Sequence, residues 1–141
     1  MPQQPVITFD DITKIALEER GRPGCDRGLL QETEQAQTVV YRIQPGTGIP
    51  THLHTQVYDL FVGVKGELEI RYEGVHGNGL FVLKPGGFCC MPPGARHEVS
   101  NPSKTEEAFF LLVHASHEGF DYIPMPLLKT DAALPFSPRR S

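Results

Sequence analysis

The sequence predicts an all-β fold, in the form of a small antiparallel β-barrel or jelly roll. Two observations lead to this class. Apolar residues recur mostly with a period of two, which is the period of a half-buried strand. In addition, 13 prolines and 14 glycines divide the 141 residues into short pieces. Because the connections between these pieces are short, we expect neighbouring segments to pair antiparallel.

The predicted elements follow one another along the chain with tight turns between them. A short helical segment is expected near the N-terminus, where Asp10 can cap a turn and Ile12 and Ile15 share a face. Turns are predicted at Pro45-Gly46, at Asn78-Gly79 and at 85–87. The predicted strands are 29–34, 38–43, 59–64, 67–73, 80–84, 88–91, 97–101 and 108–114.

The segment 67–73 has the clearest alternation of all these strands. Leu68 and Ile70 fall on one face, whereas Glu69 and Arg71 fall on the other. We therefore expect one buried face and one solvent-exposed face. The pattern associates three arginines with the barrel, namely Arg42, Arg71 and Arg96. We do not expect them to make the interior of the barrel strongly cationic.

The bulk composition favours one domain that acts on a small molecule. We predict a single domain over residues 1–141, with a C-terminal arm at 119–141. The net charge of −4 argues against nucleic acid or an anionic membrane as the partner. Because we find neither an 18-residue apolar run nor a basic-then-apolar leader, we expect no membrane span, no signal peptide and a cytoplasmic location. Cys25, Cys89 and Cys90 are expected to be reduced and structural.

Three histidines form the candidate site. His52 and His54 are two residues apart and so point to the same face of a strand. His97 lies on a later strand, so that three imidazoles could close around one divalent transition ion. Taken alone, an H-x-H pair can equally be part of the core or of the surface.

Two motifs within residues 46–101 resemble those of the cupins, which are small antiparallel β-barrels that hold a metal in the lumen. The first motif is Gly, five residues, H-x-H, three or four residues, Glu, six residues and Gly. It is matched by Gly46, His52, His54, Asp59 and Gly66. The second is matched without a gap by Gly86, Pro92, Gly94, His97 and Asn101. The resemblance implies that His52, His54 and His97 are metal ligands.

The chain departs from this pattern at Asp59, because the fourth ligand of the family is usually Glu. The Asp side chain is one methylene shorter, so we expect it to fall short of the ion and either to hold a ligand histidine or to act as a general base. In an iron-dependent dioxygenase, by contrast, Asp59 would itself bind the metal. Gln56, in phase with His54, and His114, at the end of an apolar strand, are the predicted additional ligands. One divalent ion is expected, with zinc favoured and iron, manganese or nickel as alternatives.

The expected lumen is apolar and aromatic, which favours a planar, carbonyl-rich substrate. The chain is similar to single-domain cupin cyclases of aromatic polyketide assembly. This similarity implies a metal-dependent enzyme that performs an aldol-type cyclisation of a polyketide precursor. The alternatives are an iron-dependent dioxygenase of a small aromatic or diketone compound, and a cupin that binds a small molecule without converting it. The resemblance also implies a homodimer.

Overall fold

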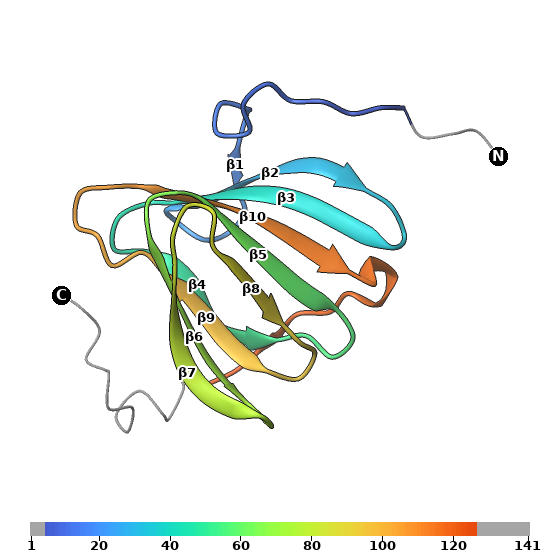
Figure 1. Cartoon of the computed structure of the whole chain (residues 1–141), viewed down its shortest axis with the longest axis vertical. Helices are drawn as coiled ribbons and strands as arrows, with labels where there is room; N and C mark the ends of the chain where they lie inside the picture. Colours follow the sequence, from blue (N-terminus) through green and yellow to red (C-terminus); the bar gives the residue numbers. More distant parts are fainter. Residues whose placement is uncertain (1–4, 127–141) are drawn as a thin grey trace.

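Two antiparallel sheets face each other in the computed structural model of the chain, which describes residues 5–126 (Figure 1). The first sheet has the strand order β1-β2-β3-β10-β5-β8, and the second has the order β11-β4-β9-β6-β7. The strands of the first sheet are β1 (Glu18–Glu19), β2 (Cys25–Glu32), β3 (Ala36–Ile43), β10 (Ala108–Ala115), β5 (Tyr58–Lys65) and β8 (Phe88–Met91). Those of the second are β11 (Ile123–Pro124), β4 (Gly48–Leu53), β9 (Arg96–Ser100), β6 (Leu68–Gly74) and β7 (Gly77–Leu83). A short 3-10 turn, η1 (His117–Gly119), follows β10.

The core lies between the two sheets and confirms the predicted all-β class. Phe61 and Phe110 from the first sheet and Ile70 and Val99 from the second are at most 1% exposed. They belong to one continuous apolar cluster. Each large apolar side chain buried in this way contributes about 1.5–3 kcal/mol to the stability of the fold.

Strands β4 and β9 approach each other closely at Gly48. His52 lies on β4, His54 follows that strand directly, and His97 lies on β9. A Cβ atom at Gly48 would lie 2.1 Å from the carbonyl oxygen of Val99, far inside van der Waals contact. Only glycine therefore permits this pairing. The close approach aligns the two strands so that His52 stands directly opposite His97.

The predicted N-terminal helical segment is wrong, because residues 10–15 form turns and bends instead. The carboxylate of Asp11 accepts hydrogen bonds from the backbone N–H of Thr13 at 2.9 Å and from its hydroxyl at 2.6 Å. Such local bonds compete with the helical ladder. The first long strand also begins earlier than predicted, at Cys25 rather than at Leu29.

The prediction that Arg71 lies on a solvent-exposed face is also wrong, because its exposed fraction is 1% and that of Glu69 is 3%. Strand β6 lies between β9 and β7, and Arg71 stands opposite Glu98 of β9. Long charged side chains on neighbouring strands thus cover one another. The hairpin after β6 turns at Val75 and His76, three residues before the predicted Asn78-Gly79 turn.

The described part of the predicted C-terminal arm, 119–126, includes β11, which pairs with β4. Residues 127–141 lie outside the described part of the chain. Within residues 5–126, no helix is both long enough and apolar enough to cross a membrane. Cys25, Cys89 and Cys90 are free thiols.

Candidate metal centre

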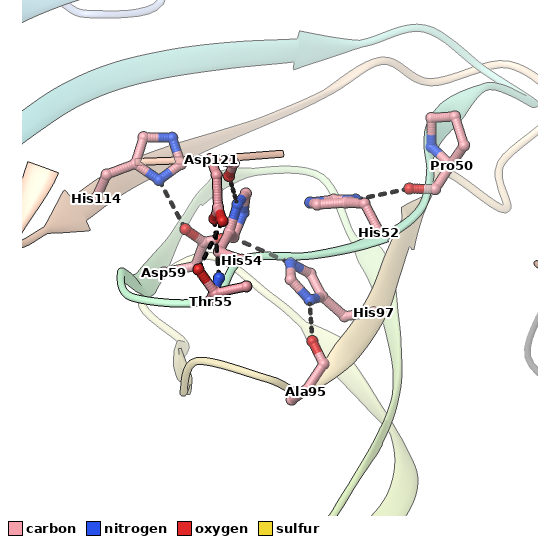
Figure 2. Close-up of polar contacts among 9 residues, drawn as sticks. All are labelled: Pro50, His52, His54, Thr55, Asp59, Ala95, His97, His114 and Asp121. Carbon is pink, nitrogen blue, oxygen red and sulfur yellow. Dashed lines mark hydrogen bonds and ion pairs between the residues drawn. The ribbon is translucent and has the colours of Figure 1, made fainter. Parts of the chain in front are cut away.

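Strand register brings the candidate side chains together from both sheets. His52 of β4 stands opposite His97 of β9 in the second sheet, and Asp59 of β5 stands opposite His114 of β10 in the first. His54 follows the last residue of β4 directly. Figure 2 shows these side chains converging, with Asp59 between His54 and His114.

Four of these residues form a compact set of potential ligand atoms. One nitrogen or oxygen from each of His52, His54, Asp59 and His97 lies within 4.8 Å of the others, and all four residues are buried. Ligands that share one transition ion at bond lengths of about 2.0–2.2 Å are roughly 3–4 Å apart. The spacing therefore fits a single ion after a small inward adjustment. We call these four residues the His-Asp cluster.

The three imidazoles of the His-Asp cluster are oriented by backbone carbonyl groups. In each ring Nδ1 donates a hydrogen bond to a carbonyl oxygen, as Figure 2 shows. The acceptors are Pro50 for His52 (2.7 Å), Asp121 for His54 (2.5 Å) and Ala95 for His97 (3.0 Å). A proton on Nδ1 leaves the lone pair of a neutral ring on Nε2, which is the atom that faces the cluster.

Asp59 reaches the imidazoles, although its short side chain was expected to fall short of an ion. Its Oδ2 lies 3.0 Å from Nε2 of His54 and 3.2 Å from Nε2 of His97. Its Oδ1 accepts a hydrogen bond of 2.7 Å from Nδ1 of His114. Burial by itself would raise the pKa of Asp59, but the hydrogen bonds from His114, His54 and His97 hold it well below its ordinary value. The carboxylate is therefore ionised at neutral pH.

The protonation of the imidazoles also suits a metal centre. Burial and the neighbouring His97 lower the pKa of His52 to about 3, so that this ring is neutral. For His54, burial acts to lower the pKa, but the hydrogen bond and the charge of Asp59 raise it above the ordinary value. A bound cation would take the place of the proton between His54 and Asp59. Three imidazole nitrogens and one carboxylate form a donor set that fits a divalent transition ion.

The two predicted additional ligands lie outside the His-Asp cluster. Gln56 is exposed, because β4 ends at Leu53 and the period of two does not continue beyond it. The amide oxygen of Gln56 lies beside Gly119, only 2.5 Å from the position that a Cβ there would occupy. His114 is buried and contacts Asp59 through Nδ1. It is thus placed to orient the carboxylate.

A cavity of about 230 Å³ opens onto the His-Asp cluster between the two sheets. Ile49, Phe61 and Leu112 form apolar walls of this cavity. Larger hollows of about 670 and 760 Å³ contain no member of the cluster.

Three arginines also line the cavity, namely Arg20, Arg22 and Arg27. None of them is among the residues predicted from the sequence. Arg27 shares a face of β2 with Cys25, a signal that could have identified it if the strand had been predicted to begin at Cys25 rather than at Leu29. Arg20 and Arg22 lie before β2, where no strand period indicates the direction of a side chain.

Comparisons with known proteins agree with this geometry. Residues 39–114 match the family described as Cupin domain. Over 95 residues the chain is 28% identical to oxalate oxidase 1 of Hordeum vulgare and 27% identical to oxalate oxidase GF-2.8 of Triticum aestivum. These alignments cover 64% of this chain but only 47% and 42% of the two relatives, so the chain spans less than half of their length.

The fold also matches solved structures. One is the polyketide cyclase RemF of Streptomyces resistomycificus, with a TM-score of 0.69 and 15% identity. That superposition covers 92% of this chain and 95% of RemF. At this identity the likeness concerns the fold alone.

Proposed function

The chain belongs to the cupin family, and on that premise we propose that it is a metal-dependent enzyme that oxidises a small, oxygen-bearing molecule inside the barrel. The observation that carries the proposal is the position of Asp59 among three imidazoles, with its Oδ2 3.0 Å from His54 and 3.2 Å from His97. We further propose that the ion is iron or manganese rather than the zinc favoured by the sequence analysis.

The donor set supports this choice of reaction class. Of the two enzymatic reactions predicted from the sequence, cyclisation suits an all-neutral shell of histidines with Gln56, which leaves the full charge of the ion to polarise a carbonyl group. Dioxygen chemistry suits a shell that includes a carboxylate, which is a common arrangement for iron. A transition ion held by the His-Asp cluster supplies positive charge to stabilise substrate oxygen atoms and, when it is redox-active, accepts and returns electrons.

The contacts of Asp59 count against a role as general base. One carboxylate oxygen faces His54 and His97, and the other accepts a hydrogen bond from His114. Both oxygens are already engaged by imidazoles, which disfavours removal of a proton from a substrate carbon, the step that an aldol-type cyclisation requires. Asp59 instead holds the imidazoles in place and balances the charge of a cation.

The size of the cavity supports a small substrate. Its volume of about 230 Å³ is below the roughly 300–1,000 Å³ of sites for drug-sized ligands. A folded poly-β-ketone chain needs more room than this. Phe61 and Leu112, both buried, make part of the cavity wall apolar. The two oxalate oxidases support the class of reaction by name, since each is an oxidase of a small, oxygen-rich molecule.

Oxygen consumption by metal-loaded protein tests the proposal. The stripped protein would be loaded with Fe(II), Mn(II) or Zn(II) and supplied with oxalate, 2-oxobutyrate or acetylacetone in an oxygen electrode. We expect uptake of oxygen with iron or manganese and at least one of these compounds, and none with zinc. An Asp59→Asn variant should lose at least nine-tenths of the uptake. Ring closure of a linear triketone by the zinc-loaded protein, with no oxygen uptake in any sample, would favour the cyclase instead.

A further inference from the structure

The three arginines at the cavity form a feature that the metal centre does not account for. Arg20 and Arg22 come from the segment that joins β1 to β2, and Arg27 lies on β2 itself. All three line the cavity that also contains His52, His54 and Asp59. We call these three residues the arginine rim.

Two members of the arginine rim lie next to aromatic residues of the cavity wall. The guanidinium carbon of Arg22 lies 4.9 Å from the centre of the Tyr122 ring, within the range of a cation–π contact. The Tyr122 ring in turn stacks on His52, with ring centres 4.5 Å apart. Arg22 is therefore separated from a metal ligand by one aromatic ring.

Arg27 of β2 stands directly opposite Tyr41 of β3, a buried member of the cavity wall. Burial raises the pKa of Tyr41, and the charge and hydrogen bond of Arg27 act in the opposite direction. A guanidinium with a preset orientation loses less side-chain entropy when it binds a ligand. Arg22 and Arg27 are both half-buried, whereas Arg20 is exposed.

The charges around the cavity are strongly unbalanced. Its lining contains three guanidinium groups and a single carboxylate, Asp59, which already contacts three histidines. Among residues 5–126, the carboxylates form no ion pair with Arg20, Arg22 or Arg27. A divalent cation in the cluster would add to the positive field. Field lines concentrate in such an apolar-walled cavity and attract an anion.

We propose that the arginine rim binds the carboxylate of a small organic acid, whose other oxygen atoms face the His-Asp cluster. The substrate class is thus a short carboxylic acid that carries a further oxygen next to the carboxylate, such as a 2-oxo acid. This inference rests on the proposed function in that it assigns the substrate of the same cavity. Guanidinium groups pair with carboxylates through two parallel hydrogen bonds, which fixes the orientation of the acid. The cavity volume, roughly that of eight water molecules in the liquid, fits such a compound.

Calorimetric binding to the zinc-loaded protein tests this proposal without turnover. The probes are 2-oxobutyrate and its neutral amide, which differ in charge but hardly in size. We expect the acid to bind at least tenfold more tightly than the amide. Arg22→Gln and Arg27→Gln should each weaken binding of the acid about tenfold, the loss of one charge-assisted pair, and should leave binding of the amide unchanged.

Matched variants keep this test free of folding effects. Lys84→Gln removes a positive charge at an exposed position outside the cavity and should leave both affinities unchanged. Arg20→Gln removes an exposed member of the rim, so it should weaken binding of the acid without affecting the fold. Arg22→Lys keeps the charge but loses the two-pronged pairing, and should fall between Arg22→Gln and the unaltered protein. Metal content is measured for every variant.

The outcomes separate this proposal from the proposed function. Equal affinity for acid and amide, or affinity for the acid that none of the arginine substitutions changes, overturns the role of the arginine rim. Oxygen uptake with acetylacetone would then still support the oxidase. Conversely, tight and arginine-dependent binding of the acid supports the rim even when the iron-loaded and manganese-loaded proteins take up no oxygen.

Discussion

The two ends of the barrel interior are built from the same strands but differ sharply in chemistry. On β5, Asp59 at one end shares a face with Phe61, and on β9 His97 shares a face with Val99. All four side chains are 1% exposed. A shift of two residues along a strand therefore replaces a candidate metal ligand by a core side chain, at equal burial.

This difference shows how burial of polar groups is compensated. At the apolar end, side chains such as Phe110 pack directly against others and stabilise the fold. At the polar end, each imidazole of the cluster bonds to a carbonyl group, and Asp59 bonds to histidines. Buried polar groups with satisfied hydrogen bonds are tolerated but add little stability. We therefore expect the apolar end to determine stability and the polar end to determine metal binding.

The largest expected effect comes from the apolar end. Phe110 is fully buried and stacks on Tyr41 with ring centres 5.1 Å apart. Phe110→Ala should lower the free energy of unfolding of the metal-stripped protein by about 3–5 kcal/mol. Denaturant titration measures this, and Phe88→Ala, at a position that is 57% exposed, is the control. A loss below about 1 kcal/mol would show that this end does not carry the stability.

The next largest effect comes from the polar end. His97→Ala should weaken metal binding by a hundredfold to a thousandfold, since a binding free energy on the order of 10–16 kcal/mol is shared among four ligands. Competition with a chelator measures the affinity. His76→Ala, in the exposed turn after β6, should leave it unchanged. Equal affinities of the two variants would remove His97 from the centre.

A smaller effect is expected at His114, which contacts the ion site through Asp59. His114→Phe keeps a ring but loses the hydrogen bond of 2.7 Å to Oδ1. Metal affinity should fall about tenfold to a hundredfold, as is typical when a group that orients a ligand is lost. His114→Gln, which can still donate a hydrogen bond, should recover most of this affinity. If both variants bind metal like the unaltered protein, His114 has no positioning role.

The smallest effect is expected at Gln56, which the sequence analysis assigned to the metal shell. Its exposed side chain lies beside Gly119, so Gln56→Ala should change metal affinity by less than twofold. A decrease comparable to that of His97→Ala would restore Gln56 as a ligand.

The polar end could be predicted from sequence only where spacing within one strand decides the geometry. His52 and His54 share a face through the period of two, and the two motifs place His97 nearby. The pairing of His114 with Asp59 depends on the register between β10 and β5, which lie about fifty residues apart in the chain. Sequence periodicity indicates which face of a strand a residue takes, but not which residues of two strands distant in the chain stand opposite each other. The reach of the short Asp59 side chain depends on the same pairing.

The errors at Gln56, Arg71 and the arginine rim have related causes. Gln56 lies where β4 has already ended, and strand ends are poorly marked in a sequence. Arg71 is buried because β6 is an inner strand of its sheet, which its alternating pattern does not reveal. Arg27 faces the cavity because β2 begins four residues before the predicted start. Each of these errors therefore concerns the bounds of a strand or its place in the sheet, and none concerns the all-β class.

The central claim is that His52, His54, His97 and Asp59 together hold one transition ion. Anomalous diffraction at the absorption edge of the bound metal tests it most directly. The account predicts one peak at about 2.0–2.3 Å from Nε2 of all three imidazoles and from one oxygen of Asp59. A peak bound by only one of these four side chains, or one that includes Gln56 and omits Asp59, would contradict it.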